Sequence, residues 1–253
     1  MALSLTADSS GLAQLSRKEL EEYMAALEEQ KRRIQRRYYY TLFPDDGPLR
    51  RDLYPKHVEF FAAGIDCRER CFMAANRVGK TVSGGFELTA HLTGEYPDWW
   101  EGRRFDRPIR AWAAGKTNET ARDIVQMKLL GKITHADGPR KKPDGTGIIP
   151  GDLHGSCTWK QGITDFIDTI YVKHVPTGEW SLLGLKSYQQ GRGSFEGTEQ
   201  DVIWLDEEPP EDVYGECLIR TATTKGLIML SFTPLEGMSS VVLSYMPQEI
   251  RPD

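Results

Sequence analysis

The sequence lacks the features that would place it among disulfide-rich or zinc-binding proteins. It contains only 4 cysteines in 253 residues, and none of them forms a C-x-x-C pair. They are Cys67, Cys71, Cys157 and Cys217. This spacing excludes a secreted-type disulfide framework and suits a reducing cytoplasm, so we expect buried thiols. His154 and Cys157 are the nearest approach to a metal cluster, and because no second pair lies close by, the sequence does not predict a structural zinc.

Long hydrophobic runs and an excess of positive charge are also absent. No apolar stretch approaches the roughly 20 residues that cross a bilayer, and no basic segment followed by an apolar run stands at the N-terminus. We therefore expect a soluble protein with no membrane partner. Lys and Arg number 32 against 37 Asp and Glu, which gives a formal net charge of -5. Any contact with nucleic acid must then be a local patch or arise in an assembly.

The first 50 residues predict a helical segment that precedes one domain over residues 51–253. The segment Ser16-Arg17-Lys18-Glu19 has the S-x-x-E form of a capping box, and apolar residues then recur at helical spacing as far as Tyr38. Acidic residues come early in this helix and basic residues late, which complements the helix dipole. A solvated charged face is favoured here over a basic patch for DNA.

The stretch from Cys71 to Thr81 organises the rest of the chain, because its pattern is typical of a strand that enters a phosphate-binding loop. Gly79, Lys80 and Thr81 fit the end of the pattern G-x-x-x-x-G-K-[ST], whereas Ala74 replaces its first glycine. A helical pattern over 82–92 follows, so the helix N-terminus and Lys80 would point at one anion. The expected nucleotide contacts are Ala75, Asn76, Arg77, Val78, Gly79, Lys80 and Thr81. A surface turn with a chance Gly-Lys-Thr is the alternative.

A second motif lies at 201–208, where an apolar run of strand length ends in three carboxylates. Carboxylates at the end of a buried strand lie where open α/β sheets bind their ligands. We expect Asp206 to hold Mg²⁺ together with Thr81, and Glu207 to orient and deprotonate the attacking water. The two motifs together predict a P-loop NTPase that binds ATP.

The remaining patterns predict an α/β fold with a mainly parallel sheet. Strands are expected at 109–115 and 226–234, a helix at 117–130 capped by Thr117 or Asn118, and a β-hairpin from the runs 169–175 and 180–185. The strand 109–114 lies between the two motifs, and a Glu directly follows Asp206. Both features indicate the RecA/ASCE-like division of P-loop proteins. Residues 135–155 have a loop-like composition, and 190–197 is expected to be a flexible polar loop that moves rather than packs.

Three side chains outside the two motifs have two interpretations each. Tyr54 and His57, just upstream of the first strand, could hold the adenine by stacking and an edge hydrogen bond, or could be ordinary core residues. Thr233 follows the strand at 226–234, where its hydroxyl could lie near the γ-phosphate or could cap a turn before Pro234.

The chain resembles the large terminase subunit of tailed bacteriophages, in its N-terminal ATPase domain only. The resemblance runs from about Tyr54 to Pro234 and rests on four segments. They are Ala75-Asn76-Arg77-Val78-Gly79-Lys80-Thr81, Gly191-Arg192 with Phe195-Glu196-Gly197-Thr198, Val202-Ile203-Trp204-Leu205-Asp206-Glu207-Glu208-Pro209, and Ser231-Phe232-Thr233-Pro234. It accounts for Ala74 and Arg77, because the family's phosphate-binding loop often lacks the first glycine and carries an internal arginine.

The resemblance implies an ATPase that packages double-stranded DNA into procapsids. Arg77 would contact the γ-phosphate, Glu207 would be the base, and residues 231–234 would couple hydrolysis to DNA movement. Portal protein and a small terminase subunit would be its partners, in a homo-oligomeric ring in the host cytoplasm. Family members usually continue into a nuclease domain, whereas this chain ends at Asp253, so we expect ATPase activity without endonuclease activity.

Two other functions remain open. The run Asp206-Glu207-Glu208 also resembles a helicase box, which would indicate a helicase-like DNA translocase. Such helicases normally need a second RecA-like domain, for which the chain has no room. The other alternative is a nucleotide-gated binding module without sustained turnover, which predicts weak hydrolysis even in the assembled state.

Overall fold

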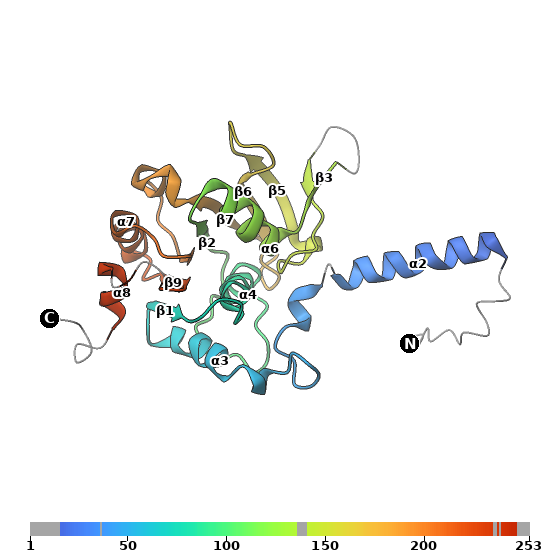
Figure 1. The fold of residues 1–253 in the computed structure, drawn as a ribbon, viewed down its shortest axis with the longest axis horizontal. Helices are drawn as coiled ribbons and strands as arrows, with labels where there is room; N and C mark the ends of the chain where they lie inside the picture. The colour runs from blue at the N-terminus through green and yellow to red at the C-terminus, as the bar shows by residue number, and fades with distance from the viewer. Residues whose placement is uncertain (1–15, 36, 136–140, 235–236, 238, 247–253) are drawn as a thin grey trace.

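A seven-stranded sheet forms the centre of the computed structural model, which describes residues 16–35, 37–135, 141–234, 237 and 239–246 (Figure 1). The spatial order is β1-β9-β8-β2-β7-β6-β5. The strands are β1 (Glu69–Met73), β2 (Arg110–Gly115), β5 (His154–Trp159), β6 (Ile167–Lys173), β7 (Trp180–Ser187), β8 (Val202–Asp206) and β9 (Leu227–Phe232). The first five in this order are parallel, and β6 and β5 continue the sheet antiparallel.

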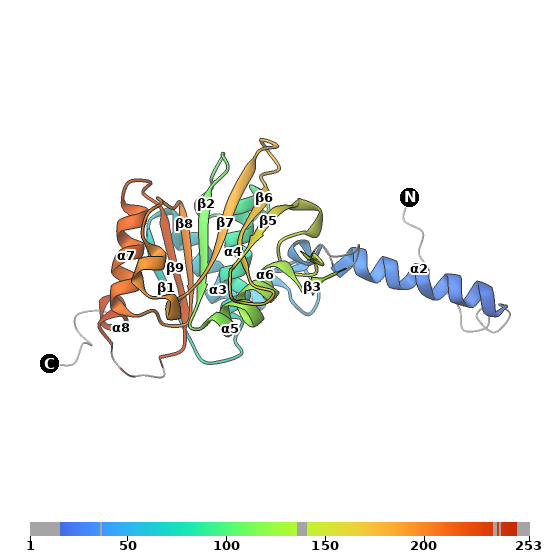
Figure 2. The same cartoon turned by 90° about the horizontal axis from the view of Figure 1, so that it is seen from above.

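Helices cover both faces of the sheet and divide the core into two layers (Figure 2). One face carries α3 (Pro55–Ala62) and α4 (Lys80–Thr93), and the other carries α7 (Glu211–Ala222) and α8 (Ser240–Tyr245). Successive side chains of a strand point to opposite faces. Accordingly, Trp204 packs in the cluster that contains α4, whereas Ile203 and Leu205 pack in the cluster that contains α7. The expected α/β fold with a mainly parallel sheet is confirmed.

The expected helix at 117–130 is present as three consecutive helical segments, a π-helical one between two α-helical ones. They are α5 (Asn118–Thr120), the π-helical η4 (Ala121–Gln126) and α6 (Met127–Leu130). Thr117 is the N-cap, and it forms a reciprocal capping box with Thr120. The π-helical middle was not expected from the sequence.

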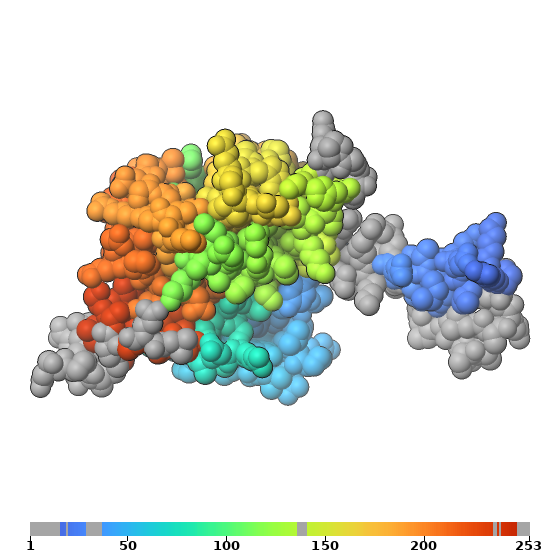
Figure 3. Space-filling view, turned by 45° about the horizontal axis from the view of Figure 1, so that its top comes forward, coloured from blue at the N-terminus to red at the C-terminus, as the bar shows by residue number. Residues whose placement is uncertain are grey.

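The N-terminal helix α2 (Arg17–Gln35) stands apart from the body of the domain (Figures 1 and 3). Its predicted helical state is confirmed, but its apolar stripe is exposed at Leu20 and Met24, which are 41% and 51% exposed. Tyr39 and Phe43, by contrast, are buried in the main core. Residues upstream of the expected boundary at 50 therefore already pack with the domain. Across the described residues, none of the helices has the length and hydropathy needed to span a membrane.

The order of the strands in the sheet does not follow their order along the chain. The predicted hairpin is confirmed as β6 and β7, but β7 also pairs in parallel with β2 and is a full member of the sheet. The strand at 109–114 is β2, which lies on the far side of β8, and β9 is the strand between β1 and β8. Parallel strands are joined by long crossovers, so their order along the chain does not fix their order in space.

Two stretches expected to be loops pack into the domain. The 135–155 stretch contributes to a small antiparallel pair, β3 (Ile133–Thr134) with β4 (Lys142–Pro143), and its Ile148 and Ile149 are fully buried. Their backbone N–H groups bond the carbonyls of Lys128 and Leu129, the end of the preceding helix. In the loop at 190–197, the ring of Phe195 is fully buried in the second cluster. The expectation that this loop moves rather than packs is wrong at that residue.

The expectation that all four thiols are buried is wrong, and a run near residue 242 with the composition of a strand is helical. The strand-like run Val241-Val242-Leu243 is helical and forms part of α8, which begins at an N-cap where the Ser239 side chain accepts from the Val242 backbone N–H. Of the four thiols, only Cys217 is buried, and Cys67 is exposed. Cys67 lies in the turn between η3 (Ala63–Ile65) and β1, where the chain reverses at the surface.

Candidate functional site

The carboxyl ends of three neighbouring parallel strands, β1, β9 and β8, form one edge of the sheet. Met73 at the end of β1 pairs with Phe232 on β9, and Asp206 at the end of β8 pairs with Ser231 on β9. The segment that leaves β1 passes directly into α4 as the loop 74–79. This loop and the carboxylates after β8 are therefore brought to the same edge, as the two sequence motifs predicted.

The loop needs a left-handed backbone at two places, and neither is the position of the missing glycine. Gly79 has φ +91, which favours glycine, and a Cβ there would also lie only 3.1 Å from His57 Nε2, so the His57 ring would have to shift. Arg77 has φ +64. Ala74 is not among the residues with positive φ. An alanine is accepted where the pattern has its first glycine because this backbone conformation suits any residue.

Lys80 ties the loop to the end of β9. Its buried Nζ donates to the carbonyls of Ala74 at 2.8 Å and Ala75 at 2.7 Å, and to Thr233 Oγ1 at 2.8 Å. The Thr233 hydroxyl in turn lies 2.8 Å from Asn76 Oδ1 and 3.0 Å from the Ala74 carbonyl. Thr233 therefore contacts the phosphate-binding loop rather than capping a separate turn. This is the location that its proposed contact with the γ-phosphate requires.

Asp206 lies between the loop and β9, where hydroxyl groups surround it. Ser231 Oγ donates to its Oδ1 at 2.7 Å, and Thr81 Oγ1 lies 3.2 Å from Oδ1 and 3.3 Å from Oδ2. Ser231 also accepts from Trp204 Nε1 at 2.9 Å. Burial raises the pKa of Asp206 to about 6, helped by the charge of Glu207, while the hydrogen bonds and Lys80 act in the opposite direction.

These oxygens fit a magnesium ion. Mg²⁺ prefers hard oxygen ligands and is usually held by one or two carboxylates together with substrate phosphates. The pair Thr81 and Asp206 supplies one hydroxyl and one carboxylate, and a cation beside this carboxylate would offset the cost of burying its charge. Across the described part of the chain there is no group of three or more His, Cys, Asp or Glu side chains placed to hold a metal without such phosphates.

The two carboxylates after Asp206 have different surroundings. The Glu207 side chain is exposed, and the residue adopts φ +69 with its N–H donating to the Ser231 carbonyl at 2.9 Å. Glu208 instead accepts a hydrogen bond from Ser239 Oγ at the start of α8. Glu207 is thus the one of the two that remains available to a water molecule. Its role as the base stays a prediction.

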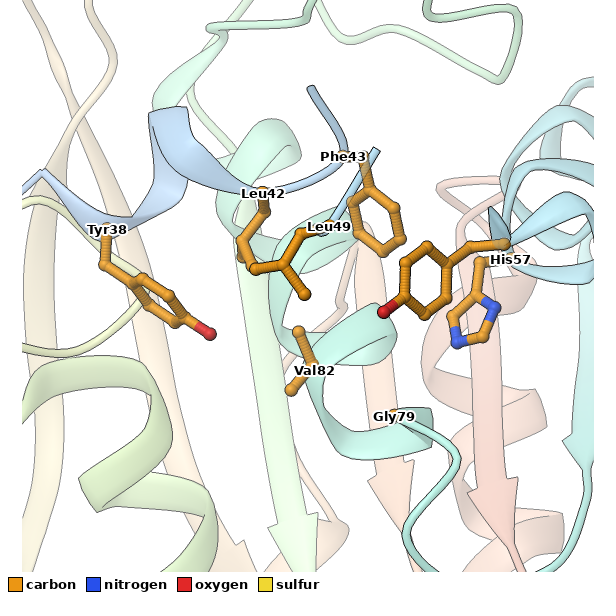
Figure 4. A pocket seen from close by; sticks show the side chains of 8 residues that line it. Tyr38, Leu42, Phe43, Leu49, His57, Gly79 and Val82 are labelled. Carbon is orange, nitrogen blue, oxygen red and sulfur yellow. The ribbon is translucent and has the colours of Figure 1, made fainter. Parts of the chain in front are cut away.

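An apolar pocket of about 130 Å³ adjoins the loop at Gly79 (Figure 4). Tyr54 and His57 line it, next to the loop as predicted for adenine contacts. Burial lowers the pKa of His57, so its ring is neutral, and Nε2 donates to the Val78 carbonyl at 3.0 Å. Sequence reasoning missed the other side chains of the pocket. They are Tyr38, Leu42, Phe43, Leu49 and Val82.

Most of these missed residues have a visible signal in the sequence. Tyr38, Leu42 and Phe43 belong to the aromatic run Tyr38-Tyr39-Tyr40-Thr41-Leu42-Phe43, which directly follows the charged N-terminal helix. Large apolar side chains clustered in this way are usually buried, so the cluster indicates packing against the domain. The residue Trp204, which orients Ser231, gave no signal beyond its place in an apolar strand.

A phosphate-binding loop that ends in Gly-Lys-Thr, a buried aspartate beside the threonine, and an exposed glutamate after it define a P-loop NTPase. A family model described as "Terminase large subunit, T4likevirus-type, N-terminal" matches residues 71–250. The large terminase subunit of Salmonella phage P22 is 39% identical over 212 residues, which cover 76% of this chain and 41% of that protein. The chain belongs to the terminase large subunit family. It spans less than half the length of the P22 protein.

Two solved terminase structures also align with this chain. The large terminase ATPase domain of Thermus phage P74-26 aligns with a TM-score of 0.47 at 14% identity, over 74% of this chain and 70% of that one. The large terminase of another thermophilic bacteriophage, solved in complex with ADP, aligns with a TM-score of 0.44 at 12% identity, over 80% and 38% of the two chains.

Proposed function

We propose that this chain is the ATPase motor domain of a DNA-packaging terminase, which hydrolyses ATP to move double-stranded DNA into a procapsid. The observation that carries the proposal is the convergence of Lys80, Thr81 and Asp206 at one edge of the sheet, with Thr81 Oγ1 3.2 Å from Asp206 Oδ1. This arrangement places a fixed positive charge and a cation-binding pair at one helix N-terminus, where a triphosphate is favoured. Membership of the terminase family supports the DNA-packaging part.

Each side chain would have a distinct role in hydrolysis. Lys80, which bonds two loop carbonyls and Thr233, would exchange these partners for the β- and γ-phosphate oxygens. Glu207 would orient and deprotonate the attacking water, and Arg77 would reach the charge that develops on the γ-phosphate. Thr81 and Asp206 would hold a magnesium ion, which would neutralise part of the phosphate charge.

The pocket beside Gly79 would hold the adenine. Its lining is mostly apolar and aromatic, which suits a flat base that stacks and loses water on binding. His57 Nε2 donates to the Val78 carbonyl and would hold the loop in place, while its Nδ1, a buried acceptor without a hydrogen-bond partner among the described residues, would accept from the edge of the base. Tyr54 would provide the stacking contact.

The wider setting is proposed from the family alone. The partners would be double-stranded DNA, a portal protein and a small terminase subunit, with the chain acting in a homo-oligomeric ring in the host cytoplasm. We also propose that this chain has no nuclease activity. Incubation with plasmid and Mg²⁺ or Mn²⁺ tests this part, and cleavage that follows the protein through gel filtration would contradict it.

The direct test is ATP turnover by the purified chain, with and without duplex DNA, beside the variant Lys80→Ala. Turnover that requires Mg²⁺ and is lost in the variant is the expected result, since the charge that stabilises the phosphates is removed. Equal turnover in both proteins would contradict the assignment of the loop. Tight binding of ATP without turnover, with or without DNA, would instead indicate a nucleotide-gated binding module.

A further inference from the structure

Tyr188 contacts the backbone at the carboxylate end of β8, although it belongs to neither of the two motifs. It follows β7 directly and opens η6 (Tyr188–Gln190), and its side chain is 5% exposed in the cluster that contains Phe195. Its hydroxyl lies 3.0 Å from the carbonyl oxygen of Asp206 and 3.0 Å from that of Glu207. One hydroxyl proton is thus shared between the two consecutive carbonyls that precede and follow the Glu207 N–H.

Glu207 adopts a backbone conformation that its own residue type disfavours. With φ +69 it lies in the left-handed region, where the Cβ of any residue other than glycine crowds the following carbonyl oxygen. Such a conformation persists only when the surroundings hold it. Here both backbone polar groups of Glu207 are bound, the N–H to the Ser231 carbonyl at 2.9 Å and the C=O to the Tyr188 hydroxyl at 3.0 Å.

We propose that Tyr188 is a positioning residue for hydrolysis, which acts by holding the left-handed turn at Glu207 so that its carboxylate faces the attacking water. This inference rests on the proposed ATPase function. Tyr188 does not touch the phosphates and acts only through Glu207. Without its hydroxyl, Glu207 can relax to negative φ, and this change redirects the Cα–Cβ bond and carries the carboxylate away from the γ-phosphate.

The scaffold that presents the hydroxyl is itself well fixed. Asn118 Oδ1 accepts from Ser187 Oγ at 2.6 Å, and the Asn118 N–H donates to Gln189 Oε1 at 3.1 Å, so the neighbours of Tyr188 on both sides are bound to the start of α5. Burial also raises the pKa of Tyr188 well above its usual value, which keeps the hydroxyl protonated as a donor. A phenylalanine would retain the ring packing and lose only the donor.

The test compares Tyr188→Phe with the matched control Tyr171→Phe, whose ring is on β6 and 43% exposed. Four quantities are measured for the wild type and both variants: kcat for ATP, KM for ATP, the affinity for a non-hydrolysable ATP analogue, and amide hydrogen exchange over residues 203–209. We expect Tyr188→Phe to lower kcat about ten- to a hundredfold, since a small misplacement of a catalytic group is enough for that loss. Analogue affinity should stay within about twofold, because Tyr188 does not touch the phosphates. A tenfold loss of affinity would correspond to about 1.4 kcal/mol of binding free energy. Exchange at Glu207 should become faster, and Tyr171→Phe should match the wild type.

Three outcomes would overturn the inference. They are an unchanged kcat, an unchanged exchange rate at 203–209, and a parallel loss of kcat, analogue affinity and thermal stability, which would show a merely structural role. A wild-type chain that binds ATP but does not turn it over would overturn the proposed function instead. Hydrogen exchange would then still decide whether Tyr188 holds the turn.

Discussion

Two turns lie at the edge of the sheet formed by the carboxyl ends of β1, β9 and β8. Both contain a residue other than glycine with positive φ, but only one of these residues is held by hydrogen bonds. Each turn places a functional candidate in the left-handed region, Arg77 at φ +64 and Glu207 at φ +69. Glu207 has its N–H bound by Ser231 and its C=O bound by Tyr188. Arg77 is exposed and has no hydrogen bond or ion pair to any other residue that the structure describes. Contacts around its loop are made by Lys80 and His57 rather than by Arg77 itself.

This difference matches the two proposed chemical roles. A general base must be in place before water arrives, because proton transfer depends on geometry within hydrogen-bond reach. An arginine that stabilises developing charge can reach the γ-phosphate only when nucleotide is bound, so an unbound side chain at the tip of the loop suits it. In our proposal Glu207, as the base, is held in place before substrate binds, whereas Arg77 would become ordered only on its substrate.

The largest effect is expected for Arg77→Ala. Because an arginine in this role contributes on the order of 10³ to 10⁵ in rate, kcat should fall far more than ATP affinity. Steady-state kinetics and analogue binding measured on the same samples check this, with Arg17→Ala on the exposed face of α2 as the control. A loss confined to affinity, with kcat unchanged, would show that Arg77 binds only the ground state. The proposed role of Arg77 in the transition state would then be wrong.

A smaller effect, on the free energy of unfolding, is expected from Asp206, the buried carboxylate next to Glu207. The pKa of Asp206 is raised from 3.8 to about 6, so between these values the folded protein holds a proton that the unfolded chain has lost. The free energy of unfolding should therefore fall as pH rises from about 4 to about 6 in metal-free buffer. A shift of about two pKa units corresponds to roughly 3 kcal/mol at most.

Urea denaturation with a chelator, across this pH range, measures the effect against Asp206→Asn, which lacks the titrating group and should lack this slope. Mg²⁺ with ATP should restore stability above pH 6 to the wild type and not to the variant. An identical pH dependence in the two proteins would show that Asp206 is not perturbed and that its setting beside Glu207 has no electrostatic consequence.

The smallest effect concerns the strain of the two turns. Glycine adopts positive φ without cost, so Glu207→Gly should raise the free energy of unfolding by about 1 kcal/mol. Arg77→Gly should gain less, because a loop whose backbone is not bound at that residue can shed part of its strain in the wild type. Chemical denaturation of both variants and the wild type measures the two gains in the free energy of unfolding. A larger gain in stability for Arg77→Gly than for Glu207→Gly would show that Arg77, and not Glu207, is the more strained residue.

The sequence predicted the nucleotide edge well because its signals there are local. An apolar strand that stops at Asp206, and a strand that passes through a loop into a helix at Lys80, carry their own geometry whatever surrounds them. The substitution at Ala74 did not obscure this loop, since the two left-handed positions are at Arg77 and Gly79. Of the two interpretations given for Thr233, the structure places its hydroxyl beside the loop.

The sequence failed where distant residues decide the structure. The run Val241-Val242-Leu243 has β-branched residues typical of a strand, but its cap at Ser239 and the burial of Val241 and Val242 against α7 favour a helix. Strand β5 has the sequence His154-Gly155-Ser156-Cys157-Thr158-Trp159, whose Gly and Ser hide it, and only its pairing with β6 makes it a strand. Tyr188 likewise has no local signal, because its partners are nearly twenty residues away.

Binding and hydrolysis of ATP are, in our proposal, separate tasks of the loop and of the fixed base. The most direct measurement is ATP binding and ATP turnover on the same preparations of wild type, Lys80→Ala and Glu207→Gln. We predict that Lys80→Ala weakens binding and abolishes turnover. Glu207→Gln should bind ATP as tightly as the wild type and lose about 10²- to 10⁴-fold in rate, because the amide keeps the shape and cannot take a proton. Loss of binding in Glu207→Gln, or normal turnover in it, would contradict this separation of tasks.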